Sequence, residues 1–417
     1  MTEGGGSAAR QLDGSAANLK SQFVTSSPEV SARPPCLPRA QRGVRSSAQL
    51  PLLSAGPPVR RSAPLPVLDA RPSRGASFHE VPVKAILNSP ATTGMGFWSL
   101  NPYVGCEFGC AYCYARETHK WRIERAGDQV NGGMEEWRNG GTGEEHSSIP
   151  PFSHSAIPAW LAFEKQILVK TTAAAVLQRT LFPAKLAGSS LVIGTATDPY
   201  QPAERRFRLT RSILEALRGW RGLTLGIITK SPLVLRDLPV LQQLAQRHDL
   251  SVNISLSSTD AALLRRIEAR SPAPHARLRA LKGLNDGGIY AGLLVAPILP
   301  CLTDSRESLA ALFEAARKAG ARYVAGFPLR VGPVTRARLL PHLADEFPGL
   351  AERYARHFDG RDYASREYTD ALNARFRALQ REYGFAVDPS LNGSRRRYRQ
   401  RQRPAGVPEA LEQWRLL

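Results

Sequence analysis

The stretch "NPYVGCEFGCAYCYARETHKW", residues 101–121, holds three of the five cysteines of the chain. Cys106, Cys110 and Cys113 follow the spacing C-x3-C-x2-C. Thiolates are soft ligands that suit zinc, Cu(I) or iron–sulfur clusters. A structural zinc site needs four ligands, commonly from two paired knuckles, and the chain has no second CxxC. The stretch therefore predicts a metal centre on three cysteines, without a fourth cysteine nearby.

Two kinds of centre fit this pattern. In the first, His119 completes a zinc site, with Cys36 and Cys301 as remote alternatives. In the second, the three cysteines bind three irons of a [4Fe–4S] cluster and leave the fourth iron open. An open iron can chelate the amino and carboxylate groups of S-adenosylmethionine (SAM), and an electron then splits the sulfonium to release a 5′-deoxyadenosyl radical.

The motif resembles the signature of the radical-SAM superfamily, C-x3-C-x-Φ-C, with Tyr112 as the aromatic residue Φ. Further segments over roughly residues 80–330 look like the branch related to spore photoproduct lyase and its uncharacterised bacterial relatives. They are "FEKQILVK", "GTATDPYQPAERRFRLTR", "TKSPLVLRD", "EARSPAPHARLRAL" and "VAPILP". The resemblance implies a [4Fe–4S] cluster on the three cysteines, SAM as cofactor, an adenine near Tyr112, and a flavodoxin- or ferredoxin-like reductant.

Short apolar runs alternate with helical patterns from about residue 80 onward. Runs of this length suit strands that are buried on both faces, as in a parallel sheet. Alternation of strand and helix predicts an α/β fold, a partial (βα)6 TIM-like barrel with its chemistry at the carboxyl ends of the strands. The expected strands lie around residues 96–103 and within 190–198, 223–230, 250–258, 289–300 and 322–330.

Helix-end signals accompany these runs. Thr210 is a candidate N-cap, Asp304 and Glu307 have the spacing of a capping box, and Gly320 stands where a C-cap glycine would. The expected organisation is a disordered basic leader over residues 1–75, a core over 76–330, a helical extension over 331–393 and a basic tail over 394–417. A polar, glycine-rich loop insertion is expected over 122–160.

Polar residues end several of the expected strands. Thr197 or Asp198 would accept a hydrogen bond from the methionyl amino group, although Asp-Pro is also a common turn opener. By resemblance to the lyase, Lys230 and Ser255 contact the carboxylate or ribose of the cofactor. A lysine that ends an apolar strand is otherwise a charge at the rim.

Other candidates are less specific. The guanidinium of Arg270 suits a carboxylate, but Glu268, Arg270 and Arg277 could equally form helix-surface ion pairs. Residues 295–297 could pack on an adenine or fill a core. Arg116 and His119 could shield the cluster or contact substrate. Cys301 is the candidate catalytic residue, as a hydrogen-atom donor, although a lone cysteine is usually inert.

One departure from the lyase limits the inference about substrate. The lyase has a hydrogen-donor cysteine just before its acidic residue after the second strand, where this chain has Thr195, Ala196 and Thr197. The O–H bond of threonine is too strong to replace a thiol. The resemblance therefore does not carry the photoproduct substrate over to this chain.

Net charge, cysteine count and hydrophobicity limit the classes of protein to which the chain can belong. The formal charge is +20, and part of the excess lies in the two tails, so a nucleic-acid partner is one option and a solvated basic surface the other. Five cysteines are too few for a disulfide scaffold, and no apolar run is long enough for a membrane span. We expect a cytoplasmic radical-SAM enzyme that abstracts hydrogen from an unidentified substrate. The alternative is a zinc or iron–sulfur protein that binds nucleic acid without SAM chemistry.

Overall fold

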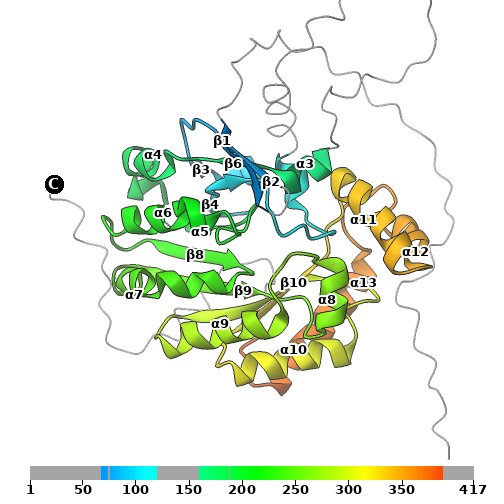
Figure 1. Ribbon diagram of the computed structural model, residues 1–417. Coiled ribbons are helices and arrows are strands. Elements are labelled where there is room, and N and C mark those ends of the chain that lie inside the picture. The colour runs from blue at the N-terminus through cyan, green and yellow to red at the C-terminus, as the bar shows by residue number, and fades with distance from the viewer. Residues whose placement is uncertain (1–66, 74–75, 120–158, 187, 388–417) are drawn as a thin grey trace, which may run out of the picture. The chain divides into compact units, whose positions relative to one another are not determined.

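A computed structural model of the chain describes residues 67–73, 76–119, 159–186 and 188–387. Its main feature is a seven-stranded sheet with the order β11-β10-β9-β8-β7-β4-β3 (Figure 1). Six of these strands are parallel and follow the chain order, and only β3 is antiparallel. The strands are β3 (Leu87–Asn88), β4 (Trp98–Leu100), β7 (Ser190–Ile193), β8 (Thr224–Thr229), β9 (Asp249–Ser255), β10 (Ala291–Ile298) and β11 (Val324–Pro328).

Helices connect the parallel strands. Each predicted strand is confirmed, since each expected range contains one of the six parallel strands or most of it. The sheet has β3 and β11 at its two edges. The parallel α/β sheet is therefore confirmed, and closure of the sheet into a barrel is not shown. The helices up to β11 are α1 (Pro90–Thr93), α3 (Ala159–Lys165), α4 (Ala173–Thr180), α5 (Glu204–Phe207), α6 (Leu209–Leu217), α7 (Leu238–Arg247), α8 (Ala261–Ile267), α9 (Pro274–Asp286) and α10 (Arg306–Lys318), with 3-10 turns at Pro183–Leu186 and Pro232–Asp237.

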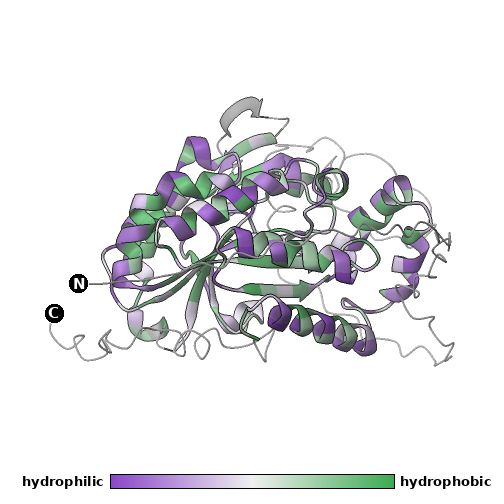
Figure 2. Ribbon diagram, turned by 90° about the horizontal axis from the view of Figure 1, so that it is seen from below, coloured by the Kyte–Doolittle hydropathy of each residue, from purple (hydrophilic) through white to green (hydrophobic). Residues whose placement is uncertain are grey.

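The apolar runs form the core because both faces of the sheet are covered. In β9, six of the seven residues are buried, and β10 begins with five buried residues in succession. The strands of this sheet are largely green in Figure 2, whereas the helices carry both green and purple residues. This is the pattern that parallel strands buried between helices require.

Two of the predicted helix ends are wrong in detail. Thr210 lies inside the first turn of α6, where its hydroxyl donates to the carbonyl of Pro199. The N-cap of α10 is Ser305, whose hydroxyl accepts from the N–H of Ser308. Asp304 instead accepts from the N–H of Cys301 and the hydroxyl of Tyr368.

The C-cap prediction is confirmed. Gly320 follows α10 with a φ of 70°, in the left-handed region that suits glycine. Its N–H donates to the carbonyl of Arg317 in the last turn of the helix.

A second, four-stranded sheet was not predicted. Its order is β1-β2-β6-β5, with β1 (Val67–Ser73), β2 (Ala76–Glu80), β6 (Gln166–Val169) and β5 (Tyr103–Val104). Phe78, Tyr103, Ile167 and Val169 from this sheet pack with Leu209 of α6 in a small core of their own. The hydroxyl of Tyr103 donates to the buried carboxylate of Glu204 at 2.6 Å and so ties this sheet to α5.

The last described part of the chain is helical, as its pattern predicts. It holds α11 (Pro333–Glu346), α12 (Leu350–His357) and α13 (Arg366–Glu382). Helix α13 packs against α10 and β11, and the ring of Phe376 lies so close to Gly326 that a Cβ there would approach it to 2.6 Å. The extension therefore packs directly on the core.

Several predicted regions fall outside the described residues. They are residues 1–66 of the expected leader, almost all of the expected insertion over 122–160, and the basic tail over 394–417. Strand β1 lies in the final part of the range expected for the leader. Among the described residues, no helix is both long enough and apolar enough to cross a membrane.

Candidate functional site

The three cysteines lie on the segment that follows β5, here called the cysteine loop (residues 105–117). Gly105 starts the loop with a φ of 86°, and a Cβ there would come within 2.9 Å of the carbonyls of Phe163 and Gln166. The N–H of Cys106 then donates to the Phe163 carbonyl at 2.9 Å. The chain thus turns into the loop against α3 and β6, in contact close enough to exclude any side chain at position 105.

The thiols gather in a largely buried environment. Cys106 and Cys110 are buried, Cys113 is partly exposed, and none forms a disulfide. Burial raises the pKa of Cys110 to about 11 and that of Cys106 well above its usual value, and the charge of nearby Cys113 contributes to both. Thiolates here therefore need a strong positive partner, such as a bound metal centre.

Three buried or partly buried thiols on one loop are a donor set that fits a multi-iron cluster. Across the part of the chain that the structure describes, no three His, Cys, Asp or Glu side chains are arranged to hold one metal ion. A [4Fe–4S] cluster makes a different demand, since each cysteine binds its own iron. His119, the other candidate ligand, is buried with its ring stacked on Phe163 at 5.8 Å.

The segment after α8 runs alongside the cysteine loop. The N–H of Ala111 donates to the carbonyl of Ile267 at 3.0 Å, and the N–H of Arg270 donates to the carbonyl of Phe108 at 3.2 Å. Cys110 and Glu268 form an isolated antiparallel bridge between these contacts. The loop is therefore held along its length by backbone hydrogen bonds from a distant part of the sequence.

The buried carboxylate of Glu164 holds the other side of the loop. It pairs with Arg116 at 2.7 Å and with Arg270 in a closer contact. Arg116 also donates to the carbonyl of Cys110 at 2.8 Å, and Arg270 donates to the carbonyl of Glu107 at 2.5 Å. Gly109 lies under this contact with a φ of 64°, and a Cβ there would overlap the Arg270 guanidinium.

A second buried carboxylate, Glu268, organises the carboxyl ends of the strands. It accepts hydrogen bonds from Tyr112 and Arg277 and lies 3.5 Å from the ammonium of Lys230. Burial opposes its ionisation, but Arg277 and Lys230 outweigh that and lower the pKa of Glu268 to about 2. A carboxylate thus stays charged among two cations in the protein interior.

Three predicted cofactor residues meet at Lys230. Its ammonium lies 3.3 Å from the hydroxyl of Tyr112 and 3.4 Å from that of Ser255, and 5.4 Å from the centre of the Tyr112 ring. Lys230 follows β8 and Ser255 ends β9, while Tyr112 belongs to the cysteine loop. The structure brings together residues that are more than a hundred positions apart.

Thr197 and Asp198, which the sequence left as alternatives for the same role, have different surroundings after β7. Asp198 accepts from the hydroxyl of Thr229 and the N–H groups of Lys230 and Tyr200, at 2.6 to 2.9 Å, so it joins the ends of β7 and β8. Burial raises the pKa of Asp198 despite these donors. Thr197 is 5% exposed, and its hydroxyl has no hydrogen-bond partner among the described residues.

Asn101 fixes the backbone around Thr197. Its side-chain carbonyl accepts from the N–H groups of Ala196 at 2.8 Å and Thr197 at 3.3 Å. Its own carbonyl accepts from the ammonium of Lys170 at 2.6 Å. The strand end that carries the unpartnered hydroxyl is therefore positioned by a residue at the start of the quoted motif.

The remaining candidates lie in three places, namely the cysteine loop, the surroundings of Glu268 and the end of β10. Arg270 lies against the cysteine loop, paired with Glu164, and Arg277 is buried in the Glu268 site. Cys301 follows β10 with a φ of 63°, next to Asp304, and its described hydrogen bond is to that carboxylate. Residues 295–297 lie in β10, where the pairing with β11 becomes irregular after Val295.

Sequence reasoning missed the residues that hold the loop. Glu164 lies in "FEKQILVK", near the end of α3, but a lone glutamate in a short apolar helix carries no signal of its partners. Gln201 accepts from the N–H of Glu107 at 3.0 Å, and the Glu107 carboxylate accepts from the N–H of Ala203 at 2.7 Å. These pairs are more than 90 positions apart, so only the fold reveals them.

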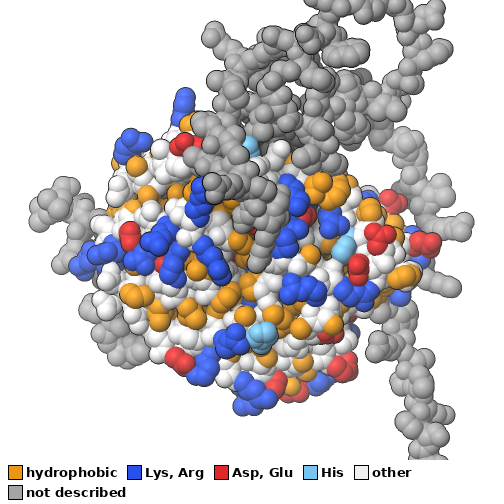
Figure 3. All heavy atoms as spheres, in the orientation of Figure 1, with side chains coloured by type: hydrophobic (Ala, Val, Ile, Leu, Met, Phe, Trp, Pro, Cys, Tyr) orange, Lys and Arg blue, Asp and Glu red, His pale blue; other side chains and the backbone are white. Residues whose placement is uncertain are grey.

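Basic side chains outside the site are widely spread. On the face shown in Figure 3, Lys and Arg occur over several elements, mixed with apolar and acidic side chains. The expectation of a nucleic-acid partner therefore stays a prediction.

The chain has clear relatives in other organisms. Uncharacterized protein Rv2578c of Mycobacterium tuberculosis is 34% identical over 316 residues, which cover 75% of this chain and 83% of the relative. Uncharacterized protein MJ0683 of Methanocaldococcus jannaschii is 27% identical over 205 residues, covering 49% and 61%. No protein-family model matches the chain.

Among solved structures, the chain is similar to a variant of spore photoproduct lyase. The TM-score is 0.50 with 14% sequence identity, and the match covers 73% of this chain and 78% of the lyase. At this identity the likeness concerns the fold.

Proposed function

The chain belongs to one family with uncharacterized protein Rv2578c of Mycobacterium tuberculosis, and we propose that it is a SAM-cleaving enzyme of the radical-SAM superfamily, in the branch related to spore photoproduct lyase. In this proposal Cys106, Cys110 and Cys113 bind a [4Fe–4S] cluster. The bound cluster and SAM would supply a 5′-deoxyadenosyl radical that abstracts hydrogen from a substrate still to be identified.

One observation carries the proposal. The three thiols lie on the loop whose Tyr112 meets Lys230 at the end of β8, and the buried Thr197 hydroxyl, which has no partner among the described residues, follows the neighbouring strand β7. A buried hydroxyl without a partner is costly, so such groups call for a ligand. We assign the Thr197 hydroxyl as the acceptor for the amino group of SAM, and Asp198 as the residue that fixes the turn beside it.

The residues around Lys230 would bind the rest of the cofactor. Its ammonium is positioned between Tyr112 and Ser255, and it offers donors to a carboxylate or to ribose oxygens. The ring of Tyr112, with its hydroxyl held by Glu268, offers a flat surface to an adenine. Arg270 would act indirectly, because its guanidinium is already engaged by Glu164 and the loop carbonyl.

The substrate and the partners remain open within this proposal. The likeness to spore photoproduct lyase makes nucleic acid one candidate substrate, and the +20 charge is compatible with it. The chain has threonine where the lyase has a donor cysteine, so a different hydrogen donor is required. Cys301 is our candidate for that role, and a flavodoxin- or ferredoxin-like protein is our candidate reductant.

Anaerobic reconstitution tests the proposal. The wild-type chain should bind four irons, give an EPR signal on reduction that SAM perturbs, and form 5′-deoxyadenosine with dithionite. Cys113→Ala should abolish the 5′-deoxyadenosine. Cys36→Ala, which changes a cysteine outside the motif, is the matched control and should behave as wild type.

Two outcomes would contradict the proposal. Stoichiometric zinc without iron would support the alternative zinc protein. SAM cleavage that persists in Cys113→Ala would mean that the three cysteines do not bind the cluster.

A further inference from the structure

The first turn of α11 lies on the last cysteine of the loop. The hydroxyl of Thr335, which is fully buried, donates to the carbonyl of Cys113 at 3.2 Å. The N–H of the same threonine donates to the carboxylate of Glu117 at 2.8 Å. Thr335 therefore bonds to the cysteine loop through both its side chain and its backbone, across 222 and 218 positions of sequence.

Helix chemistry explains why Glu117 suits this place. The first N–H groups of a helix have no partner within it, and the helix N-terminus favours negative charge. Pro333 at the start of α11 removes one such donor, and Glu117 accepts from another. A Cβ at Gly332 would come within 2.6 Å of the Glu117 carboxylate, so the glycine permits this close approach.

A second contact joins α11 to the same assembly one turn later. Arg338 lies 3.6 Å from Glu164, the carboxylate that also pairs with Arg116 and Arg270. Its guanidinium lies 5.2 Å from the centre of the Trp160 ring on α3. Two turns of α11 thus contact the loop and the helix beside it.

The three cysteines differ in what holds their backbone. Cys106 bonds to Phe163, and Cys110 bridges to Glu268 and accepts from Arg116, all within the core. Cys113 is the most exposed of the three, and beyond its own turn its described backbone partner is Thr335.

We propose that α11 is a positioning element of the cluster site, and that Thr335 holds Cys113 in the geometry that binds iron. This inference rests on the proposed function, because it assigns the helical extension a part in the same site. The extension would then keep the cluster bound at its most exposed ligand.

The substitution Thr335→Val tests this, since it removes the hydroxyl and keeps the shape. We expect chelator-driven iron loss to accelerate about fivefold, the factor for one hydrogen bond of about 1 kcal/mol. In the metal-free protein, alkylation of Cys113 should accelerate by a similar factor relative to Cys106, as mass spectrometry would measure. Thr335→Ser keeps the hydroxyl and should restore both rates and the EPR signal of wild type.

Thr369→Val is the matched control, because it removes a threonine hydroxyl that donates to the Ser365 carbonyl at 3.0 Å in α13. Equal iron loss and equal Cys113 alkylation in Thr335→Val and this control would overturn the inference. A wild-type chain that binds no iron would instead overturn the proposed function. The alkylation rates would still decide whether Thr335 holds Cys113, since they need no metal.

Discussion

Glu268 and Thr197, at the carboxyl ends of the parallel strands (the carboxyl edge), differ from His248 at the amino ends (the amino edge). At the carboxyl edge, Glu268 lies buried between Arg277 and Lys230, and the hydroxyl of Thr197 has no partner in the described chain. At the amino edge, His248 is also buried, but its ring is satisfied. Its Nδ1 accepts from the N–H of Leu223 at 3.2 Å, and its Nε2 bonds to the carbonyl of Leu217 at 3.1 Å.

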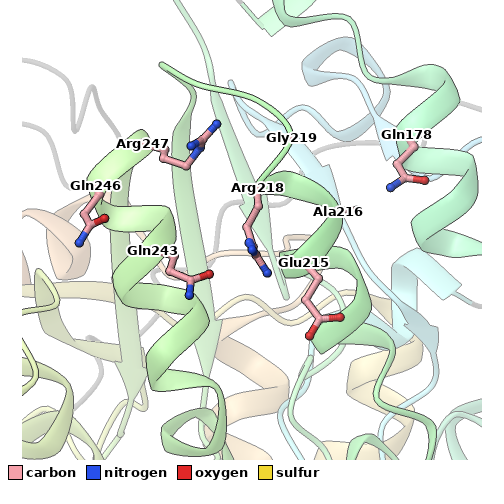
Figure 4. A pocket seen from close by; sticks show the side chains of 8 residues that line it. All are labelled: Gln178, Glu215, Ala216, Arg218, Gly219, Gln243, Gln246 and Arg247. Carbon is pink, nitrogen blue, oxygen red and sulfur yellow. The ribbon is translucent and has the colours of Figure 1, made fainter.

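The amino edge has a hollow of a different character. It lies at the carboxyl ends of α6 and α7 and beside α4, and Figure 4 shows its lining of polar side chains. Arg218, Gln243 and Gln246 are exposed there, and Arg247 is partly exposed. Solvent can satisfy such groups, so this hollow calls for no ligand, whereas the buried groups of the other edge do.

Removing the charge of Glu268 should have the largest effect on stability. Glu268→Gln leaves Arg277 and Lys230 in the interior without their counter-charge, which costs about 3–5 kcal/mol. Denaturant unfolding of the metal-free protein measures this loss. Glu215→Gln, which breaks an exposed pair with Arg211, should cost no more than about 0.5 kcal/mol. A loss below about 1 kcal/mol in Glu268→Gln would mean that the two cations are stabilised otherwise.

Thr197→Val should separate binding from stability. The hydroxyl has no described partner, so the unfolding free energy should stay the same or rise slightly. The affinity of the cluster-loaded protein for SAM should fall roughly tenfold in calorimetric titrations, as expected when a bond to a charged group is lost. Arg247→Ala at the amino edge is the control and should leave the affinity unchanged. An unchanged affinity in Thr197→Val would remove this residue from the proposed site.

The smallest effect should come from His248, whose protonation makes the unfolding free energy depend on pH. Burial lowers its pKa below the value of about 6.5 that it has when unfolded. Below that value the unfolded chain binds more protons, so the stability that His248 contributes is present above pH 6.5 and is lost as the pH falls. The slope is at most about 1.4 kcal/mol per pH unit.

Unfolding of His248→Gln at several pH values isolates this contribution. The difference in unfolding free energy from wild type should shrink between pH 7.5 and 5.5. A constant difference across this range would mean that His248 takes up its proton equally in the folded and unfolded chain.

The sequence predicted what depends on local pattern. Apolar runs located the six parallel strands, because a strand buried on both faces needs an apolar residue at nearly every position. The cysteine spacing identified the loop, and the resemblance to the lyase predicted a cofactor role for Lys230 and Ser255, which end two of the expected strands. The residue pattern of the C-terminal extension likewise predicted helices.

The features that the sequence did not predict are contacts between residues far apart in the chain. The strands of the smaller sheet are short, and β6 pairs with β2 and β5 across gaps that no local pattern encodes. Thr197 and Asp198 are neighbours with similar chemistry, and only their surroundings show that one is satisfied and the other is not. The contact of Thr335 with Cys113 has no sequence signal at all.

The separation of these contacts also has a consequence for biosynthesis. Ser271, whose hydroxyl lies 3.5 Å from the sulfur of Cys110, follows that cysteine by 161 residues, and Thr335 follows Cys113 by 222. A ribosome therefore releases the cysteines long before it makes the residues that enclose them. Contacts this distant in sequence also form late in folding, since long loops must close first. In the proposed enzyme, iron and sulfur would then be delivered to a nearly finished chain, after the extension has left the ribosome.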